Sequence, residues 1–134
     1  MNSLIQKRVA KASYSFAVDG GAATAITPSV TDLIPSGAII NSVTIDSKTA
    51  FTSGGSATIA LTAGGVTIMA AVAYSASPFS ATVPQYMSRT TGAVAVVPYV
   101  PIKTLSSAVI AVVIGTVPLT AGVMDIYVEY TFAD

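Results

Sequence analysis

Residues 119–132 read LTAGVMDIYVEYTF, and they contain the clearest structural signal in this chain. From residue 124 onward, apolar and polar side chains alternate. Successive residues of a β-strand point to opposite faces, so this pattern predicts a long antiparallel strand with one buried side. We expect the Gly-bearing segment 119–122 to form a turn before that strand. The face predicted to be buried consists of Met124, Ile126, Val128, Tyr130 and Phe132.

Shorter segments with the same alternation precede this strand, and Gly or Pro interrupts them at intervals of a few residues. Turn signals about every 8–12 residues are typical of a sandwich or barrel. Gly64-Gly65 is expected to close a hairpin between 56–62 and 66–68. The sequence therefore predicts an all-β fold, an antiparallel β-sandwich with jelly-roll-like character. The interior is expected to contain Phe16, Val43, Ile45, Ile59, Leu61, Ile126, Val128, Tyr130 and Phe132.

The segment 108–114, Ala-Val-Ile-Ala-Val-Val-Ile, is apolar on both faces. This pattern fits a central strand buried on both sides, or a strand whose outer face is covered by a neighbouring subunit. The uncharged run 104–124 is also long enough for a membrane span. Gly115 and Pro118 interrupt it, so a small membrane protein is the weaker alternative, and we expect no membrane partner.

Composition limits the class of protein. The chain has 134 residues, of which 52% are hydrophobic and 9% charged, with zero net charge. Soluble domains average about 25% charged residues. The length suits one domain, and the excess apolar surface favours self-association into a homo-oligomer. We expect no nucleic-acid partner, because such partners need a basic face.

Residues 1–12 are predicted to form an N-terminal arm, and residues 13–134 a single β-sandwich domain. The arm contains cations without a following apolar run, so no secretory signal is predicted. Lys7, Arg8 and Lys11 are half of the cations in the chain. They could dock on an acidic partner surface, or belong to a solvated terminus. We select them with Tyr127, on the polar face of the last strand, as candidate partner-binding residues.

Few side chains in this sequence could act as catalytic groups, because it contains no His and no Cys. The carboxylates are single and scattered, and Asp125 and Glu129 lie about 13 Å apart along one strand. A pair acting on a glycosidic bond needs a separation of at most about 9.5 Å. No phosphate loop or calcium loop is present. We therefore predict no enzymatic activity, no catalytic residues, no metal site and no cofactor.

Three segments resemble small β-sandwich virion structural proteins of tailed bacteriophages, of the capsid decoration or cement type. They are Leu33-Ile34-Pro35-Ser36-Gly37-Ala38-Ile39 with its continuation to Asp46, then Thr49-Ala50-Phe51-Thr52-Ser53-Gly54-Gly55-Ser56-Ala57-Thr58-Ile59, and 119–130. The resemblance covers roughly residues 30–132. It implies a non-enzymatic protein, made in the host cytoplasm, that seats on the capsid exterior. The expected partners are copies of itself, as a trimer, and the major capsid protein. The alternative is a module of a tail or fibre, or one that binds glycans through Tyr127.

Overall fold

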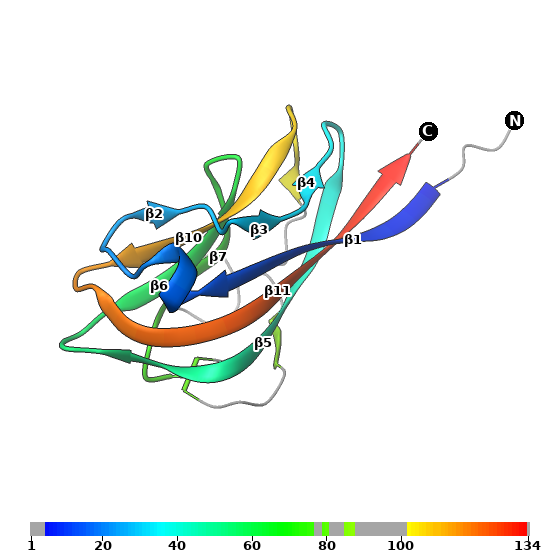
Figure 1. Ribbon diagram of the computed structural model, residues 1–134. Helices are drawn as coiled ribbons and strands as arrows, with labels where there is room; N and C mark the ends of the chain where they lie inside the picture. Colours follow the sequence, from blue (N-terminus) through cyan, green and yellow to red (C-terminus); the bar gives the residue numbers. More distant parts are fainter. Residues whose placement is uncertain (1–4, 77–78, 81–84, 88–101, 134) are drawn as a thin grey trace, which may run out of the picture.

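The computed structural model describes residues 5–76, 79–80, 85–87 and 102–133, which form two facing antiparallel sheets (Figure 1). The prediction of an all-β sandwich is confirmed, whereas its jelly-roll-like character stays a prediction. The first sheet has the order β3-β1-β11-β5-β8, and β9 also pairs with β5. Its strands are β1 (Ile5–Ser15), β3 (Val30–Thr31), β5 (Ile39–Ser53), β8 (Gln85–Met87), β9 (Ile102–Lys103) and β11 (Leu119–Ala133).

The second sheet has the order β2-β10-β6-β7, and β4 pairs with the other part of β10. Its strands are β2 (Ala25–Ile26), β4 (Leu33–Ile34), β6 (Thr58–Ala63), β7 (Val66–Ala73) and β10 (Ala108–Gly115). The predicted hairpin at Gly64-Gly65 is present and joins β6 to β7. A single helical turn, α1 (Phe16–Asp19), follows β1. Among the described residues, no helix has the length and apolar character that crossing a membrane requires.

Strand β11 lies between β1 and β5 and pairs with both. Its inward residues from Met124 to Tyr130 are buried, as the alternation predicts. The expected turn at 119–122 is instead part of β11, because Leu119 and Ala121 pair with β5 across register shifts. The change of direction comes earlier, between β10 and β11, where Thr116 has a φ of 72°.

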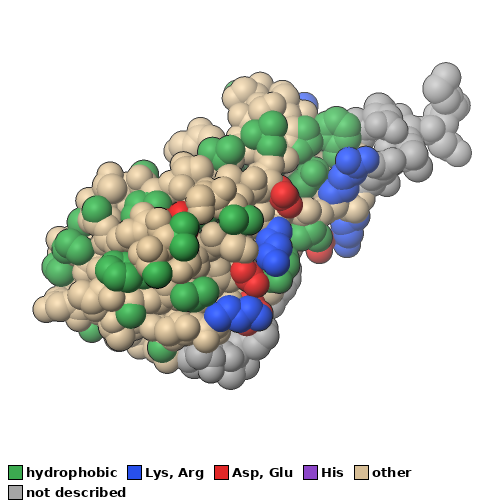
Figure 2. Space-filling model, viewed as in Figure 1, with side chains coloured by type: hydrophobic (Ala, Val, Ile, Leu, Met, Phe, Trp, Pro, Cys, Tyr) green, Lys and Arg blue, Asp and Glu red, His purple; other side chains and the backbone are tan. Residues whose placement is uncertain are grey.

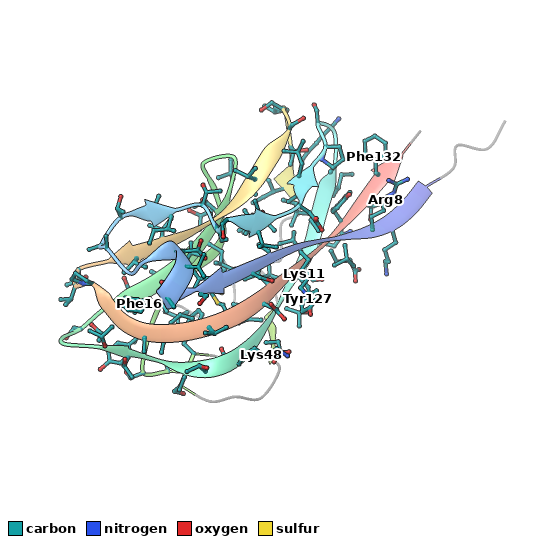
Figure 3. All side chains as sticks on the ribbon, in the orientation of Figure 1. Arg8, Lys11, Phe16, Lys48, Tyr127 and Phe132 are labelled. Atoms are coloured by element: carbon teal, nitrogen blue, oxygen red, sulfur yellow. The ribbon has the colours of Figure 1, made fainter. Side chains whose placement is uncertain are left out.

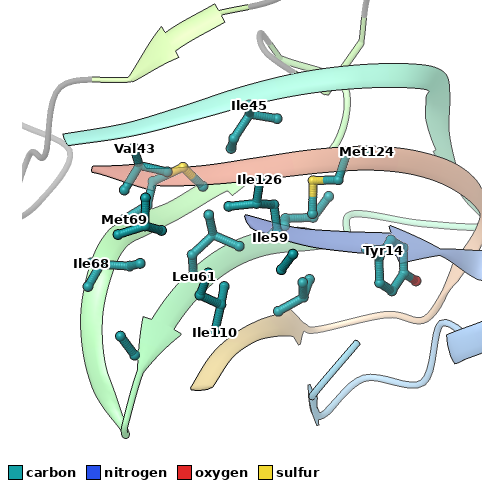
Figure 4. Packing of buried hydrophobic residues seen from close by; sticks show 14 of the residues in the cluster. Tyr14, Val43, Ile45, Ile59, Leu61, Ile68, Met69, Ile110, Met124 and Ile126 are labelled. Carbon is teal, nitrogen blue, oxygen red and sulfur yellow. The ribbon is translucent and has the colours of Figure 1, made fainter. Parts of the chain in front are cut away.

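The core fills the space between the two sheets (Figure 4). All predicted core residues are buried except Phe16 and Phe132, which are partly exposed. The error at Phe16 has a local cause: β1 ends at Ser15, and the period of two ends with it. Tyr14 is buried instead, whereas Val18 is 70% exposed.

Strand β10 is central in its sheet, as expected, but only one of its faces is buried. Ala108, Ile110, Val112 and Ile114 point into the core. The alternate residues lie on the outer face, where Val109 is 38% exposed. Of the two expectations for this segment, burial on both sides within one chain is therefore wrong, and coverage by another subunit stays a prediction.

The N-terminal segment differs from the expected division at residue 12. Residues 5–15 form one continuous strand, and every position from Ile5 to Ser15 has a register partner on β11. The expected boundary thus falls inside β1, because long-range pairing with β11 orders residues that carry no strong local signal. Residues 1–4 of the predicted arm lie outside the described part of the chain.

Gly122 lets the start of β11 pass over the ring of Phe51. Its φ is +145°, and a Cβ at this position would overlap Cδ1 of Phe51. We expect Gly122→Ala to lower the free energy of unfolding by about 2–4 kcal/mol, through overpacking and backbone strain. Urea denaturation measures the change. Gly54→Ala is the control, because a Cβ there meets nothing within 4 Å, and it should stay within about 0.5 kcal/mol of the original chain.

Tyr14 fastens the end of β1 to the core. Its ring stacks on Phe51 at 5.9 Å, and its hydroxyl donates to the carbonyl oxygen of Gly20. Burial, with a smaller contribution from the charge of Asp19, raises the pKa of Tyr14 from 10.0 to about 12. The fold therefore favours the protonated phenol. This contribution to stability is complete below pH 10 and is lost as the pH rises through 12.

Tyr14→Phe should lower stability near pH 7 by about 1–3 kcal/mol, because the Gly20 carbonyl loses its donor. The stability difference between the two proteins should then narrow as the pH rises from 10 towards 12. Urea denaturation at several pH values measures both effects. Parallel loss of stability in the two proteins above pH 10 would show that Tyr14 does not contribute in this way.

Candidate interaction surface

The two outer faces of the sandwich differ in charge. The outer face of the first sheet carries side chains of both signs in alternation over β1, β11 and β5 (Figure 2). We call this surface the charged face. Its ionised side chains are Lys7, Lys11, Asp46, Lys48, Asp125 and Glu129.

Three ion pairs neutralise the charged face. The Nζ–O separation is 3.3 Å between Lys7 and Glu129 and 3.8 Å between Lys11 and Asp125. On β5 the Nζ of Lys48 donates to Oδ2 of Asp46 at 2.5 Å, and this hydrogen bond with the charge of Asp46 raises the pKa of Lys48. All three cations are exposed, and solvent screens their attraction to the carboxylates, so each pair contributes little to stability. The charged face is thus electrically balanced and remains accessible to a partner.

Asp46 and Asp125 lie directly opposite each other on β5 and β11, so the expectation that carboxylates are scattered singly is wrong here. Each has its own partners: Lys48 contacts Asp46, whereas Lys11 and the hydroxyl of Ser13 contact Asp125. The two lysines place a positive charge beside each of the neighbouring carboxylates. Sequence reasoning had no signal for this pairing, because it depends on the register between strands far apart in the chain.

Three of the four candidate partner-binding residues come together on the charged face. Lys11 is the register partner of Tyr127, and its Nζ lies 5.6 Å from the centroid of the Tyr127 ring, a cation–π distance (Figure 3). Lys7 lies four residues before Lys11, on the same side of β1. Arg8 alternates to the opposite side, opposite Tyr130 and close to Phe132 in Figure 3. The basic segment is therefore divided between two surfaces.

Among the described residues, none on the outer face of the second sheet is charged, and we call this surface the neutral face. Small and β-branched residues oppose each other across its strands, for example Ala111 with Thr62 and Val113 with Ala60. Leu33 and Val109, which are 60% and 38% exposed, are register partners on it. The neutral face comprises Ala25, Leu33, Thr58, Ala60, Thr62, Thr67, Ala71, Ala73, Val109, Ala111 and Val113.

A partly open hollow of about 230 Å³ lies at one end of the sandwich, beside the β6–β7 hairpin. Its lining is mostly apolar, with Lys103 as its one charged residue and Leu105 89% exposed at the surface. Among the described residues, no carboxylate lines it. Within the described ranges, no group of three or more His, Cys, Asp or Glu side chains could hold a metal ion.

Solved structures share this architecture over nearly the whole chain. One is a chain of the acidic stable capsid structure of Helicobacter pylori bacteriophage KHP30, with a TM-score of 0.59, 13% identity, and coverage of 96% of this chain and 94% of that chain. Another is a chain of the cyanophage Pam1 capsid asymmetric unit, with a TM-score of 0.59, 19% identity, and coverage of 96% and 86%.

No protein-family model matches the chain, and no curated protein sequence does. At such low identity the two solved structures establish the fold. The resemblance to phage virion proteins that the sequence motifs indicated is confirmed at that level.

Proposed function

We propose that this protein is a non-enzymatic structural protein of a phage virion, which decorates the capsid exterior and stabilises the shell. The observation that carries the proposal is the match in fold, over 96% of the chain, to chains from two phage capsid structures. The surface chemistry supports it. The described residues offer the outer faces of two sheets and no convergent set of catalytic groups, which suits assembly better than turnover.

The neutral face supports self-association. Its outward residues on β10 and β6 are only partly buried within one chain, and none of them is charged. A second copy can cover such a surface without desolvating any ion, and obligate interfaces of this kind resemble a core cut in half. Identical chains normally close into a symmetric ring. A trimer is the form we propose, because a capsid lattice offers threefold positions.

The charged face is our choice for contact with the major capsid protein. Lys7, Lys11 and Tyr127 project from it beside carboxylates, so it can present donors, acceptors and one aromatic ring. Individual contacts of this type are weak. A trimer would make each of them three times, and effective concentration then raises the affinity without new contacts.

A charge placed on the neutral face should break the oligomer. We expect the original protein to sediment as an oligomer and Ala111→Lys as a monomer, because the substitution would bury an unpaired ammonium group in the interface. Thr44→Lys is the matched control in the middle of the charged face, and it should leave the oligomer intact. Sedimentation velocity distinguishes these states. A monomeric original protein, or an unchanged Ala111→Lys oligomer, would contradict this interface.

Capsid binding tests the function itself. The purified protein should co-sediment saturably with phage capsids assembled without it, and it should raise the temperature at which those capsids disrupt. Ala111→Lys should bind at least about 100-fold more weakly, because a monomer lacks avidity. Thr44→Lys tests whether the charged face meets the capsid and should also weaken binding, while leaving the oligomer intact. Absence of co-sedimentation, together with binding to a glycan array that Tyr127→Ala abolishes, would favour a glycan-binding module.

A further inference from the structure

The outer edge of β1 is open along its first half. β3 pairs with β1 only at Ala12 and Ser13, and β11 occupies the opposite edge of β1. Among the described residues, no strand lies on the β3 side of positions 5–10. This part of β1 projects away from the body of the sandwich beside the end of β11 (Figure 1).

The backbone groups on this edge can be assigned from Lys11. Its carbonyl accepts from the N–H of Asp32 at 2.8 Å, and its N–H donates to Oδ2 of Asp32 at 2.9 Å. Both groups of Lys11 thus point away from β11. Alternate residues of a strand direct their N–H and C=O to the same edge, so those of Val9 and Lys7 point the same way. The open edge therefore presents hydrogen-bonding groups ready for another strand.

A second copy of β1 is a poor occupant of this edge. A twofold antiparallel pairing centred on Lys7 or on Arg8 places that cation opposite itself. A pairing centred on Val9 places Lys7 opposite Lys11 of the other copy. Like charges directly opposite each other destabilise a strand pair. The cations of β1 thus disfavour edge-to-edge pairing between copies, and they require an occupant with negative charge.

We propose that the open edge of β1, residues 5–9, binds an extended acidic segment of another protein as an added strand in line with β3. Asp32 already shows the chemistry within the fold, because its carboxylate accepts the N–H of Lys11 at the point where β3 ends. Lys7 is 73% exposed in its side chain, and an ammonium group has three donors, so it can hold a second carboxylate besides Glu129.

Val9 determines which type of residue fits at the middle of the added strand. It is 55% exposed and lies between Lys7 and Lys11 on the same side of β1. A segment with an apolar residue opposite Val9 and an acidic residue two positions further on would cover Val9 and face Lys7, because Asp32 already occupies the position opposite Lys11. In strand addition, main-chain hydrogen bonds supply affinity and alternate side chains supply specificity. The inference is independent of the proposed function, because the edge would take such a segment from any protein that presents it.

Val9→Pro tests the main-chain bonds directly. Proline removes the N–H that points off the edge, whereas the hydrogen bonds to β11 come from the alternate residues and remain. The probe is a synthetic peptide, Thr-Val-Thr-Glu-Thr-Glu-Thr, which places Val and Glu on the same face of an extended strand, titrated into the isotope-labelled full chain. We expect the amide signals of Lys7 and Val9 to shift, with affinity at least tenfold weaker in Val9→Pro. Val9→Ala keeps the N–H and loses only side-chain contact, so it should weaken binding less than Val9→Pro does.

The charge requirement has its own test, which holds even if Val9→Pro disturbs the fold. The peptide with Lys in place of each Glu should bind at least tenfold more weakly to the original chain, and Lys7→Glu should reduce that preference. Any of three results would overturn the proposal. The two peptides could bind equally well, the peptide could perturb amide signals remote from β1, or a folded Val9→Pro variant could bind the peptide with unchanged affinity. Loss of capsid binding with peptide binding intact would contradict the proposed function alone.

Discussion

The double pairing of β11, with β1 along one edge and β5 along the other, is the constraint on which the rest of the structure depends. It brings Ile5 opposite Ala133 and Tyr127 opposite both Lys11 and Thr44. Because one face of these three strands is apolar, the sheet they form must be covered, and the second sheet covers it. Such pairings join distant parts of the chain, so forming them costs conformational entropy. Local structure alone therefore cannot establish this sheet.

The two outer faces illustrate different ways to expose a sheet to water. On the charged face, cations and carboxylates neutralise one another across β1, β11 and β5 while staying hydrated. On the neutral face, threonine hydroxyls are the principal polar side-chain groups between alanine and valine. Six of the charged residues that the structure describes thus lie together on one outer face. Covering the neutral face carries no ionic desolvation cost, whereas covering the charged face does.

Strand β1 combines a structural role with an exposed one. Its inward residues Ala10, Ala12 and Tyr14 are buried, and Tyr14 joins an aromatic cluster with Phe51 and Phe79. Its outward residues include Lys7 and Lys11, and the described strands leave its edge open at positions 5–10. The acids near the other end of β1 have structural tasks: Asp19 accepts from the N–H groups of Ser15 and Ser29, and Asp32 closes the edge at Lys11. Strand β3 and Asp32 thereby cover the edge of β1 at residues 11–13, and no other described strand covers it at residues 5–10.

The strands, their buried sides and most of the core could be predicted from the sequence, because alternation is a local consequence of strand geometry. Val43, Ile59 and Ile126 were therefore assigned correctly. Where the local pattern continued past a strand end, as at Phe16, the same reasoning failed. Tertiary structure alone decided which strands pair, that residues 5–12 join the sheet, that Asp46 meets Asp125, and that the outer face of β10 stays open. These features depend on contacts between residues far apart in the chain. Such contacts stabilise the fold only once both sheets have formed.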